Sequence, residues 1–210
     1  MIRIFLAALL LGSTASAEGE KPGEFEYYIM ALSWSPNWCA LEGDRKASPQ
    51  CDSSHDHGWI LHGLWPQNEH LWPSYCKTNE RAPPRAMTRE MADIMGTKGL
   101  AWHQWKKHGT CTGLSATDYF ALSRKAYDAI NRPALLRKLS KPVKLPAKII
   151  EEAFMEANPA LHANQITITC KQRHIQEARI CLTKDLKLRQ CAFQSAGDCR
   201  LKDATLNPIR

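Results

Sequence analysis

The stretches ILHGLWP, residues 60–66, and WHQWKKHGTC, residues 102–111, are the most informative parts of this sequence. Each segment places histidine beside tryptophan and glycine, and the second adds lysine. Two histidines can donate one proton and accept another near neutral pH. A neighbouring lysine can stabilise a negatively charged, phosphorus-centred transition state. These are the groups that cleavage of RNA through its own 2′-hydroxyl requires, and that chemistry needs no metal ion.

The second segment is expected to form a helix over residues 102–110. At about 100° per residue, four polar side chains then share one helix face of about 140°. Trp102 and Trp105 point elsewhere and are expected to face the interior. The alternative is a solvated polar face, but the two tryptophans and the glycine beside it favour a rigidly held site. The shared face would carry His103, Gln104, Lys107 and His108.

The N-terminus has the features of a secretory signal peptide over residues 1–17. Arg3 supplies the charged start, residues 4–11 the apolar run, and Ala15-Ser16-Ala17 the cleavage site. That run is far shorter than the roughly 20 residues that span a bilayer, so we expect no membrane anchor. Removal of the signal peptide leaves residues 18–210, which are enough for one domain with a substantial core. We therefore expect a secreted or periplasmic protein.

Cysteine usage and charge limit the class of protein further. The eight cysteines form an even set without a C-x-x-C pair. This agrees with disulfides in an oxidising compartment and disfavours a metal–thiolate site. The formal net charge of +7 favours a polyanionic partner, although simple solubility is the alternative reading. No block of five like charges indicates a basic nucleic-acid-binding tail.

Strands and helices are mixed along the chain without a regular βαβ alternation. The expected fold class is therefore α+β, a single disulfide-stabilised domain with a central, largely antiparallel sheet flanked by helices. Strand 58–61 would deliver His62 at its end, and four prolines predict a loop over 66–85. A stripe of three methionines predicts a helix over 85–95. The other expected strands are 25–34, 166–170, 178–182 and 186–191, and the other expected helices are 115–131 and 146–158.

Several segments resemble the T2 family of acid endoribonucleases, in particular a bacterial-type secreted member. The two that correspond to its active-site motifs are His62-Gly63-Leu64-Trp65-Pro66 and Lys107-His108-Gly109-Thr110-Cys111. Similarity extends to residues 31–36 (ALSWSP), 150–159 (IEEAFMEANP) and 179–186 (RICLTKDL), and covers roughly residues 25–200.

The resemblance implies metal-independent cleavage of single-stranded RNA through a 2′,3′-cyclic phosphate by a monomer without a cofactor. It makes His108 the general base and His62 the general acid, and it assigns phosphate binding to Lys107 and His103. Trp65 would stack on a base, for which the alternative is core packing. The implied disulfides are Cys39–Cys51, Cys76–Cys111, Cys170–Cys199 and Cys181–Cys191.

One position departs from the family pattern, because Gln104 stands where a glutamate is usual. An amide carries no charge and cannot raise the pKa of a neighbouring histidine by attraction. Reduced turnover or a shifted pH optimum is expected. A second reading is a catalytically weakened RNA-binding or cytotoxic protein of the same fold, and a third is a disulfide-rich extracellular binding module.

The remaining histidines have no catalytic neighbour in the sequence. His55 and His57 either line the cleft or lie in a solvated loop, and the loop is favoured. The others, His70, His162 and His174, are expected at the surface or in the core.

Overall fold

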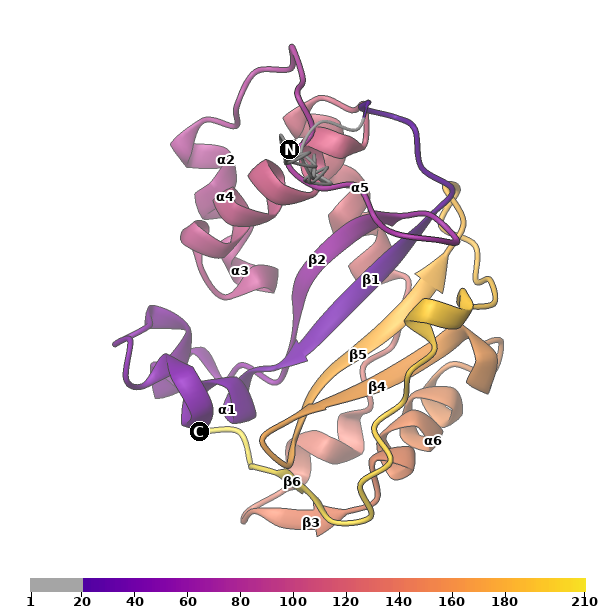
Figure 1. The fold of residues 1–210 in the computed structure, drawn as a ribbon. Helices are drawn as coiled ribbons and strands as arrows, with labels where there is room; N and C mark the ends of the chain where they lie inside the picture. Colours follow the sequence, from indigo (N-terminus) through magenta and orange to yellow (C-terminus); the bar gives the residue numbers. More distant parts are fainter. Residues whose placement is uncertain (1–20) are drawn as a thin grey trace, which may run out of the picture.

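The computed structural model describes residues 21–210, so the signal peptide expected at residues 1–17 lies outside the described residues. A six-stranded sheet has the order β2-β1-β5-β6-β3, and β4 pairs with β5 beside this path (Figure 1). All pairs are antiparallel except β5–β6. The expected α+β domain with a largely antiparallel sheet is confirmed. Its strands are β1 (Tyr27–Trp34), β2 (Trp59–Gln67), β3 (Val143–Leu145), β4 (Ile166–Lys171), β5 (His174–Leu182) and β6 (Ala204–Leu206), and its helices are α1 (Ser35–Trp38), α2 (Arg85–Glu90), α3 (Ala92–Met95), α4 (Lys98–Lys107), α5 (Ala116–Asp128) and α6 (Ala147–Ala157).

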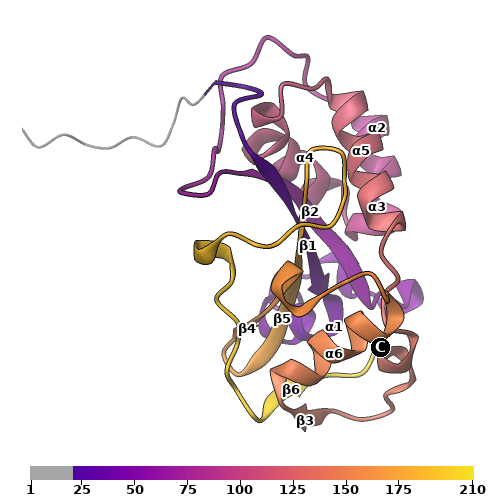
Figure 2. The same ribbon diagram turned by 90° about the vertical axis from the view of Figure 1, so that its right-hand side faces the viewer.

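The two faces of the sheet have different roles because side chains alternate along each strand. On β1, Tyr28, Met30, Leu32 and Trp34 belong to the main hydrophobic core, whereas Ile29 belongs to a small cluster on the opposite face. Helices α5 and α6 lie on the same side of the sheet, and the segment around residues 192–199 lies on the other (Figure 2). Helices α3 and α4 pack against β2, which is the edge strand of the sheet on that side.

Strand β2 is longer than the sequence predicted, and it includes the first motif. The expected strand ended at Leu61, but the observed one continues to Gln67. Its pairing with β1 shifts register, because Leu61 faces Leu32 and Gly63 faces Ala31. His62 is therefore the extra residue of a β-bulge, which lies inside the strand and not at its end. A bulge of this kind locally re-aims a side chain.

The helices expected over residues 115–131 and 146–158 are present, but the single helix expected over residues 85–95 is not. There the chain forms α2 and α3, separated at Met91, whose ψ of −9° does not continue an α-helix. The methionine stripe still packs on the core through Met87, Met91 and Met95. Ser115 caps α5 by accepting a hydrogen bond from the Asp118 amide, as its spacing predicted. Helices α5 and α6 end within three residues of the expected positions.

The strand expected at 186–191 is wrong. Leu186 has a φ of +63°, which bends the chain back into a turn closed by the Thr183 amide on the Lys187 carbonyl. Only Leu188 forms an isolated bridge, to Leu182. Strand β5 instead begins earlier than expected, at His174.

All four expected disulfides are present. Their Cα–Cα separations are 5.5 Å for Cys39–Cys51, 4.9 Å for Cys76–Cys111, 5.5 Å for Cys170–Cys199 and 5.3 Å for Cys181–Cys191. The bridge Cys76–Cys111 joins the loop after β2 to the segment after α4, and so ties the two histidine motifs together. Within the described part of the chain, no helix is long and apolar enough to span a membrane.

Candidate active site

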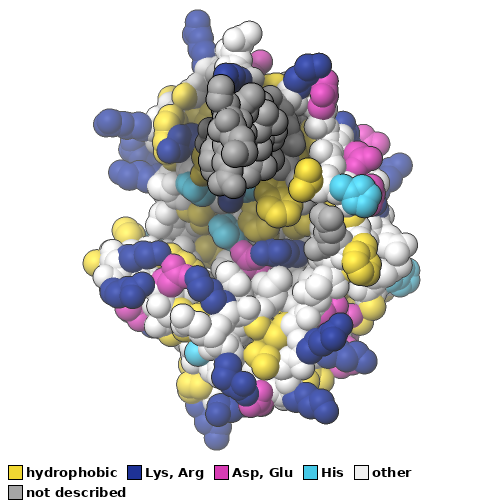
Figure 3. All heavy atoms as spheres, viewed as in Figure 1, with side chains coloured by type: hydrophobic (Ala, Val, Ile, Leu, Met, Phe, Trp, Pro, Cys, Tyr) yellow, Lys and Arg dark blue, Asp and Glu magenta, His cyan; other side chains and the backbone are white. Residues whose placement is uncertain are grey.

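A cleft of about 350 Å³ lies on the sheet face that carries Ile29, opposite the face that packs on the main core. The space-filling view shows histidine, acidic and basic side chains meeting at a hollow near the middle of this face (Figure 3). Strand β2 contributes His62 and Trp65 to the lining, and strand β5 contributes Glu177 and Arg179. Helix α4 and the residue after it contribute the other four expected side chains. All six residues selected from the sequence thus line one cleft: His62, Trp65, His103, Gln104, Lys107 and His108.

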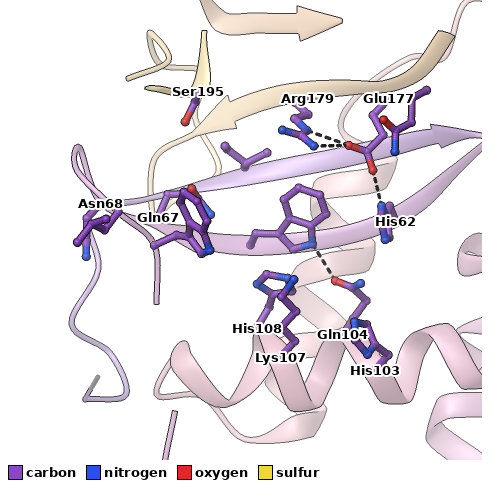
Figure 4. A pocket seen from close by; sticks show the side chains of 15 residues that line it. His62, Gln67, Asn68, His103, Gln104, Lys107, His108, Glu177, Arg179 and Ser195 are labelled. Atoms are coloured by element: carbon purple, nitrogen blue, oxygen red, sulfur yellow. Dashed lines mark hydrogen bonds and ion pairs between the residues drawn. The ribbon is translucent and has the colours of Figure 1, made fainter. Parts of the chain in front are cut away.

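His62 is held by a carboxylate that the sequence did not point to. Its Nδ1 lies 2.5 Å from Oε1 of Glu177, on the strand two places away in the sheet (Figure 4). The other carboxylate oxygen of Glu177 accepts a hydrogen bond from Nε of Arg179 at 2.8 Å and forms an ion pair with Nη2 at 2.7 Å. Glu177 is only 1% exposed. His62 therefore sits at the open end of a buried ion-pair network.

The second motif occupies α4 and the turn that follows it. Thr97 caps the helix by accepting a hydrogen bond from the Leu100 amide. The helix ends at Lys107, and His108 has left helical geometry with a φ of −121°. The four expected side chains still converge on the cleft: Gln104 and His108 are buried, Lys107 is half-buried and His103 is exposed. The predicted convergence of these four side chains is present, but the helix expected over residues 102–110 is wrong at both ends, because α4 runs from Lys98 to Lys107 and His108 follows it.

Gln104 is engaged with Trp65. Its Oε1 accepts a hydrogen bond from the indole Nε1 at 2.8 Å. The helix approaches β2 this closely because Gly63 has no side chain. A Cβ at position 63 would lie 2.0 Å from that amide oxygen and 2.4 Å from the indole nitrogen. Gln104 therefore orients Trp65, a contact that the sequence did not suggest.

Trp65 contacts both catalytic candidates. Its ring stacks on His108 at a centroid distance of 5.3 Å and meets His62 edge-on at 5.2 Å. The guanidinium of Arg179 lies 5.4 Å from the indole centroid. One indole ring thus fixes the separation of the two imidazoles.

Three ionisable groups of the cleft, His103, His108 and Glu177, have shifted pKa values. Burial, together with Lys107 and the other two imidazoles, lowers the pKa of His108 to about 2. The buried Nδ1 of His108 has no hydrogen-bond partner among residues 21–210, so Nε2 is its route to the cleft. Partial burial and Lys107 also lower the pKa of His103. Burial alone would raise the pKa of Glu177, but His62 and Arg179 bring it below its ordinary value.

Two tryptophans behave differently from each other on α4. Trp105 is 2% exposed, as expected, but Trp102 is 39% exposed, and its expected inward orientation is wrong. The inward face of α4 is formed by Ala101, Gln104 and Trp105 at i, i+3 and i+4. Trp102 follows Ala101 by about 100° and faces outward beside Lys106.

The remaining histidines lie outside this cleft, in agreement with the favoured reading. His55 and His57 stack on each other at 5.2 Å, and neither lines it. His70 and His162 are exposed, and His174 is half-buried. Among residues 21–210, no group of three or more histidine, cysteine, aspartate or glutamate side chains is arranged to hold a metal ion.

Sequence reasoning missed the contributions of β5 and of the loop after β2. Glu177 precedes the strand expected over residues 178–182 and Arg179 lies within it, whereas β5 begins at His174 and so places both residues on the strand. Leu71 and the half-exposed Trp72 also line the cleft. An apolar pair in a proline-rich loop was the available signal.

Known proteins resemble the chain in sequence and in fold. The model of the ribonuclease T2 family matches residues 25–191. A ribonuclease of Aeromonas hydrophila is 38% identical over 185 residues, which cover 86% of this chain and 81% of that protein. An RNase-related protein from Calystegia sepium has the same fold, with a TM-score of 0.68 at 20% identity over 89% of this chain and 98% of that one. The structure of RNase NT in complex with 5′-AMP gives a TM-score of 0.63 at 18% identity, over 89% and 100% of the two chains.

Proposed function

The chain belongs to the ribonuclease T2 family and is an RNA-cleaving enzyme, and on that premise we propose that it cleaves single-stranded RNA by transphosphorylation. The reaction forms a 2′,3′-cyclic phosphate and needs no metal ion. The observation that supports this most directly is the meeting of His62, His108 and Lys107 in one cleft. These three side chains supply an acid, a base and a fixed positive charge.

His108 is the proposed general base. Its low pKa keeps the imidazole neutral at any ordinary working pH, so the ring is able to accept a proton. Because Nδ1 is buried, Nε2 takes the proton from the 2′-hydroxyl. The 2′-oxygen then attacks phosphorus and forms the new P–O2′ bond. This is the first half of a concerted proton exchange.

His62 is the proposed general acid. As the P–O5′ bond breaks, His62 protonates the departing 5′-oxygen, so the leaving group is a neutral hydroxyl. When water later opens the cyclic phosphate, the two histidines exchange their roles by microscopic reversibility. The edge-on and stacked contacts with Trp65 keep both rings on the same side of the cleft.

Charge on the pentavalent phosphorus is the third requirement. Lys107 supplies a cation, and His103 is the proposed hydrogen-bonding partner of a phosphate oxygen. Arg179 lines the same cleft and adds a second fixed cation. Trp65, whose ring lines the cleft, is the proposed stacking surface for a base, with Trp72 at the same opening.

Secretion to the periplasm or the medium is part of the proposal. The signal-peptide features of residues 1–17 support it, and so do the four disulfides of the domain. The protein is proposed to act as a monomer on single-stranded RNA.

The test is incubation of the purified protein with a single-stranded oligoribonucleotide and excess chelator. Mass spectrometry is expected to show fragments with cyclic phosphate ends. His62→Ala and His108→Ala should each lower the rate by about 10²–10⁴. His55→Ala, an exposed histidine outside the cleft, is the matched control and should cleave normally.

The same assay separates the other two readings. Binding of the oligonucleotide without cleavage would favour a catalytically weakened RNA-binding protein. Neither binding nor cleavage would favour an extracellular binding module. Near-normal cleavage by either folded histidine variant would remove that residue from its proposed role.

A further inference from the structure

Glu177 is a buried carboxylate whose position needs an explanation. It lies on β5 at 1% exposure, with one oxygen on His62 and the other on Arg179. A buried ion pair is weak evidence for a stabilising role, because desolvation of the charges offsets much of their attraction. Its contact with a proton-transfer residue points to a role in the reaction instead.

The sheet is built so that this contact can form. Strand β1 runs between β2 and β5, so Glu177 and His62 belong to strands about 10 Å apart. On β1, Ser33 lies opposite Glu177 and Ala31 lies opposite Arg179. These two small side chains leave room above β1, and the bulge at His62 turns the imidazole toward that room. The hydrogen bond between His62 and Glu177 therefore depends on the positions of β2, β1 and β5.

We propose that Glu177 is a positioning residue that acts through His62, a role that rests on the proposed ribonuclease function. The carboxylate accepts the Nδ1–H of His62 and thereby directs Nε2 into the cleft. It also stabilises the protonated ring, which is the form that donates a proton to the 5′-oxygen. Arg179 holds the other carboxylate oxygen and keeps Glu177 from turning away.

The charges facing His62 make this stabilisation necessary. From β5 it faces Glu177 and Arg179, and from α4 and its end it faces His103, Lys107 and His108. The positive groups in this set oppose a charge on the His62 ring. Among the described residues that line the cleft, Glu177 is the only acidic one. Loss of its charge therefore makes the protonated ring harder to maintain.

The test begins with Glu177→Gln, which removes the charge and keeps the shape. We expect kcat to fall by about tenfold or more with KM little changed, because the effect falls on proton transfer. We also expect the alkaline limb of the pH–rate profile to move down by about one pH unit. Glu177→Asp keeps the charge and should restore the position of that limb. Glu151→Gln removes another buried carboxylate, on α6, and is the matched control with an unmoved profile.

A measurement on the unaltered protein guards against a variant that does not fold. Nitrogen NMR of the His62 ring should show the Nδ1–H tautomer in its neutral form. An Nε2–H tautomer would overturn the proposal. So would a folded Glu177→Gln variant with unchanged kcat and pH profile. If the unaltered protein cleaves no RNA while His62 shows the Nδ1–H tautomer, the proposed function fails, whereas the contact with Glu177 stands.

Discussion

Gln104→Glu is the most informative substitution in this chain. It places a carboxylate where the family usually has one, without changing the size of the side chain. In the structure the side-chain oxygen of Gln104 accepts a hydrogen bond from Trp65 at 2.8 Å, and a carboxylate oxygen can accept the same bond. The substitution therefore changes the charge while it preserves the orientation of the indole.

The size of the effect follows from the surrounding distances. The centroid of Trp65 lies 5.2 Å from that of His62 and 5.3 Å from that of His108. For a carboxylate at position 104 that contacts the same indole as the two imidazoles, a separation taken as roughly 6 Å gives an interaction of about 3 kcal/mol at an effective dielectric constant of about 20. That corresponds to about 2 pH units. Because the His62 side chain is 34% exposed, screening reduces the effect, and we expect both limbs to move up by about one unit.

The assay is a pH–rate comparison of the two proteins on a dinucleotide substrate at fixed ionic strength. We also expect a higher maximal turnover, because the protonated imidazole becomes easier to maintain. Gln165→Glu adds the same charge outside the cleft and controls for a general change in RNA attraction. Superimposable profiles would show that position 104 is not coupled electrostatically to the histidines, and the charge argument would then be refuted.

Two further predictions concern packing and acid stability. Gly63→Ala forces the side chain of Gln104 away from Trp65 and should lower kcat/KM by about a hundredfold. Gly99→Ala is the control and should not change kcat/KM, because its Cβ would lie 3.8 Å from the nearest atom. Equal kcat/KM values for the two variants would contradict the close packing at Gly63. The His108 ring has a pKa of about 6.5 in the unfolded chain and of about 2 in the folded protein. The neutral ring therefore contributes fully to the free energy of unfolding above pH 6.5. That contribution is lost as the pH falls toward 2, by up to about 1.4 kcal/mol per pH unit. His108→Asn should flatten this slope in urea unfolding measured between pH 6 and 3, and an unchanged slope would show that His108 is not the group responsible.

The sequence predicted the site well where the residues belong to one continuous element. The α4 residues share a face because helical spacing alone brings them together. The same spacing also shows why Trp102 was misplaced, since the inward direction depends on what the helix packs against. The sequence predicts too early an end for strand β2, because His62 interrupts the apolar run. Only the pairing with β1 shows that the strand continues past a bulge at His62.

Contacts between distant strands were beyond prediction from one sequence. Glu177 lies 115 residues after His62, and their meeting depends on strand order, register and the small residues on β1. A single-residue slip of β5 would turn Glu177 to the opposite face of the sheet. Likewise, residues 186–191 do not form the expected strand, because Leu186 has a positive φ and turns the chain. The apolar composition of this segment does not reveal that turn.

In the proposed mechanism, the position of Glu177 gives the two histidines different tasks. Glu177 contacts Nδ1 of His62, whereas His108 is buried beside Lys107, where a second charge is disfavoured. Environments that separate two titratable groups in this way assign the acid and the base. A carboxylate at position 104 would favour charge on both rings. With glutamine at that position, the proposed division between acid and base rests on the contact of Glu177 with His62 and on the burial of His108.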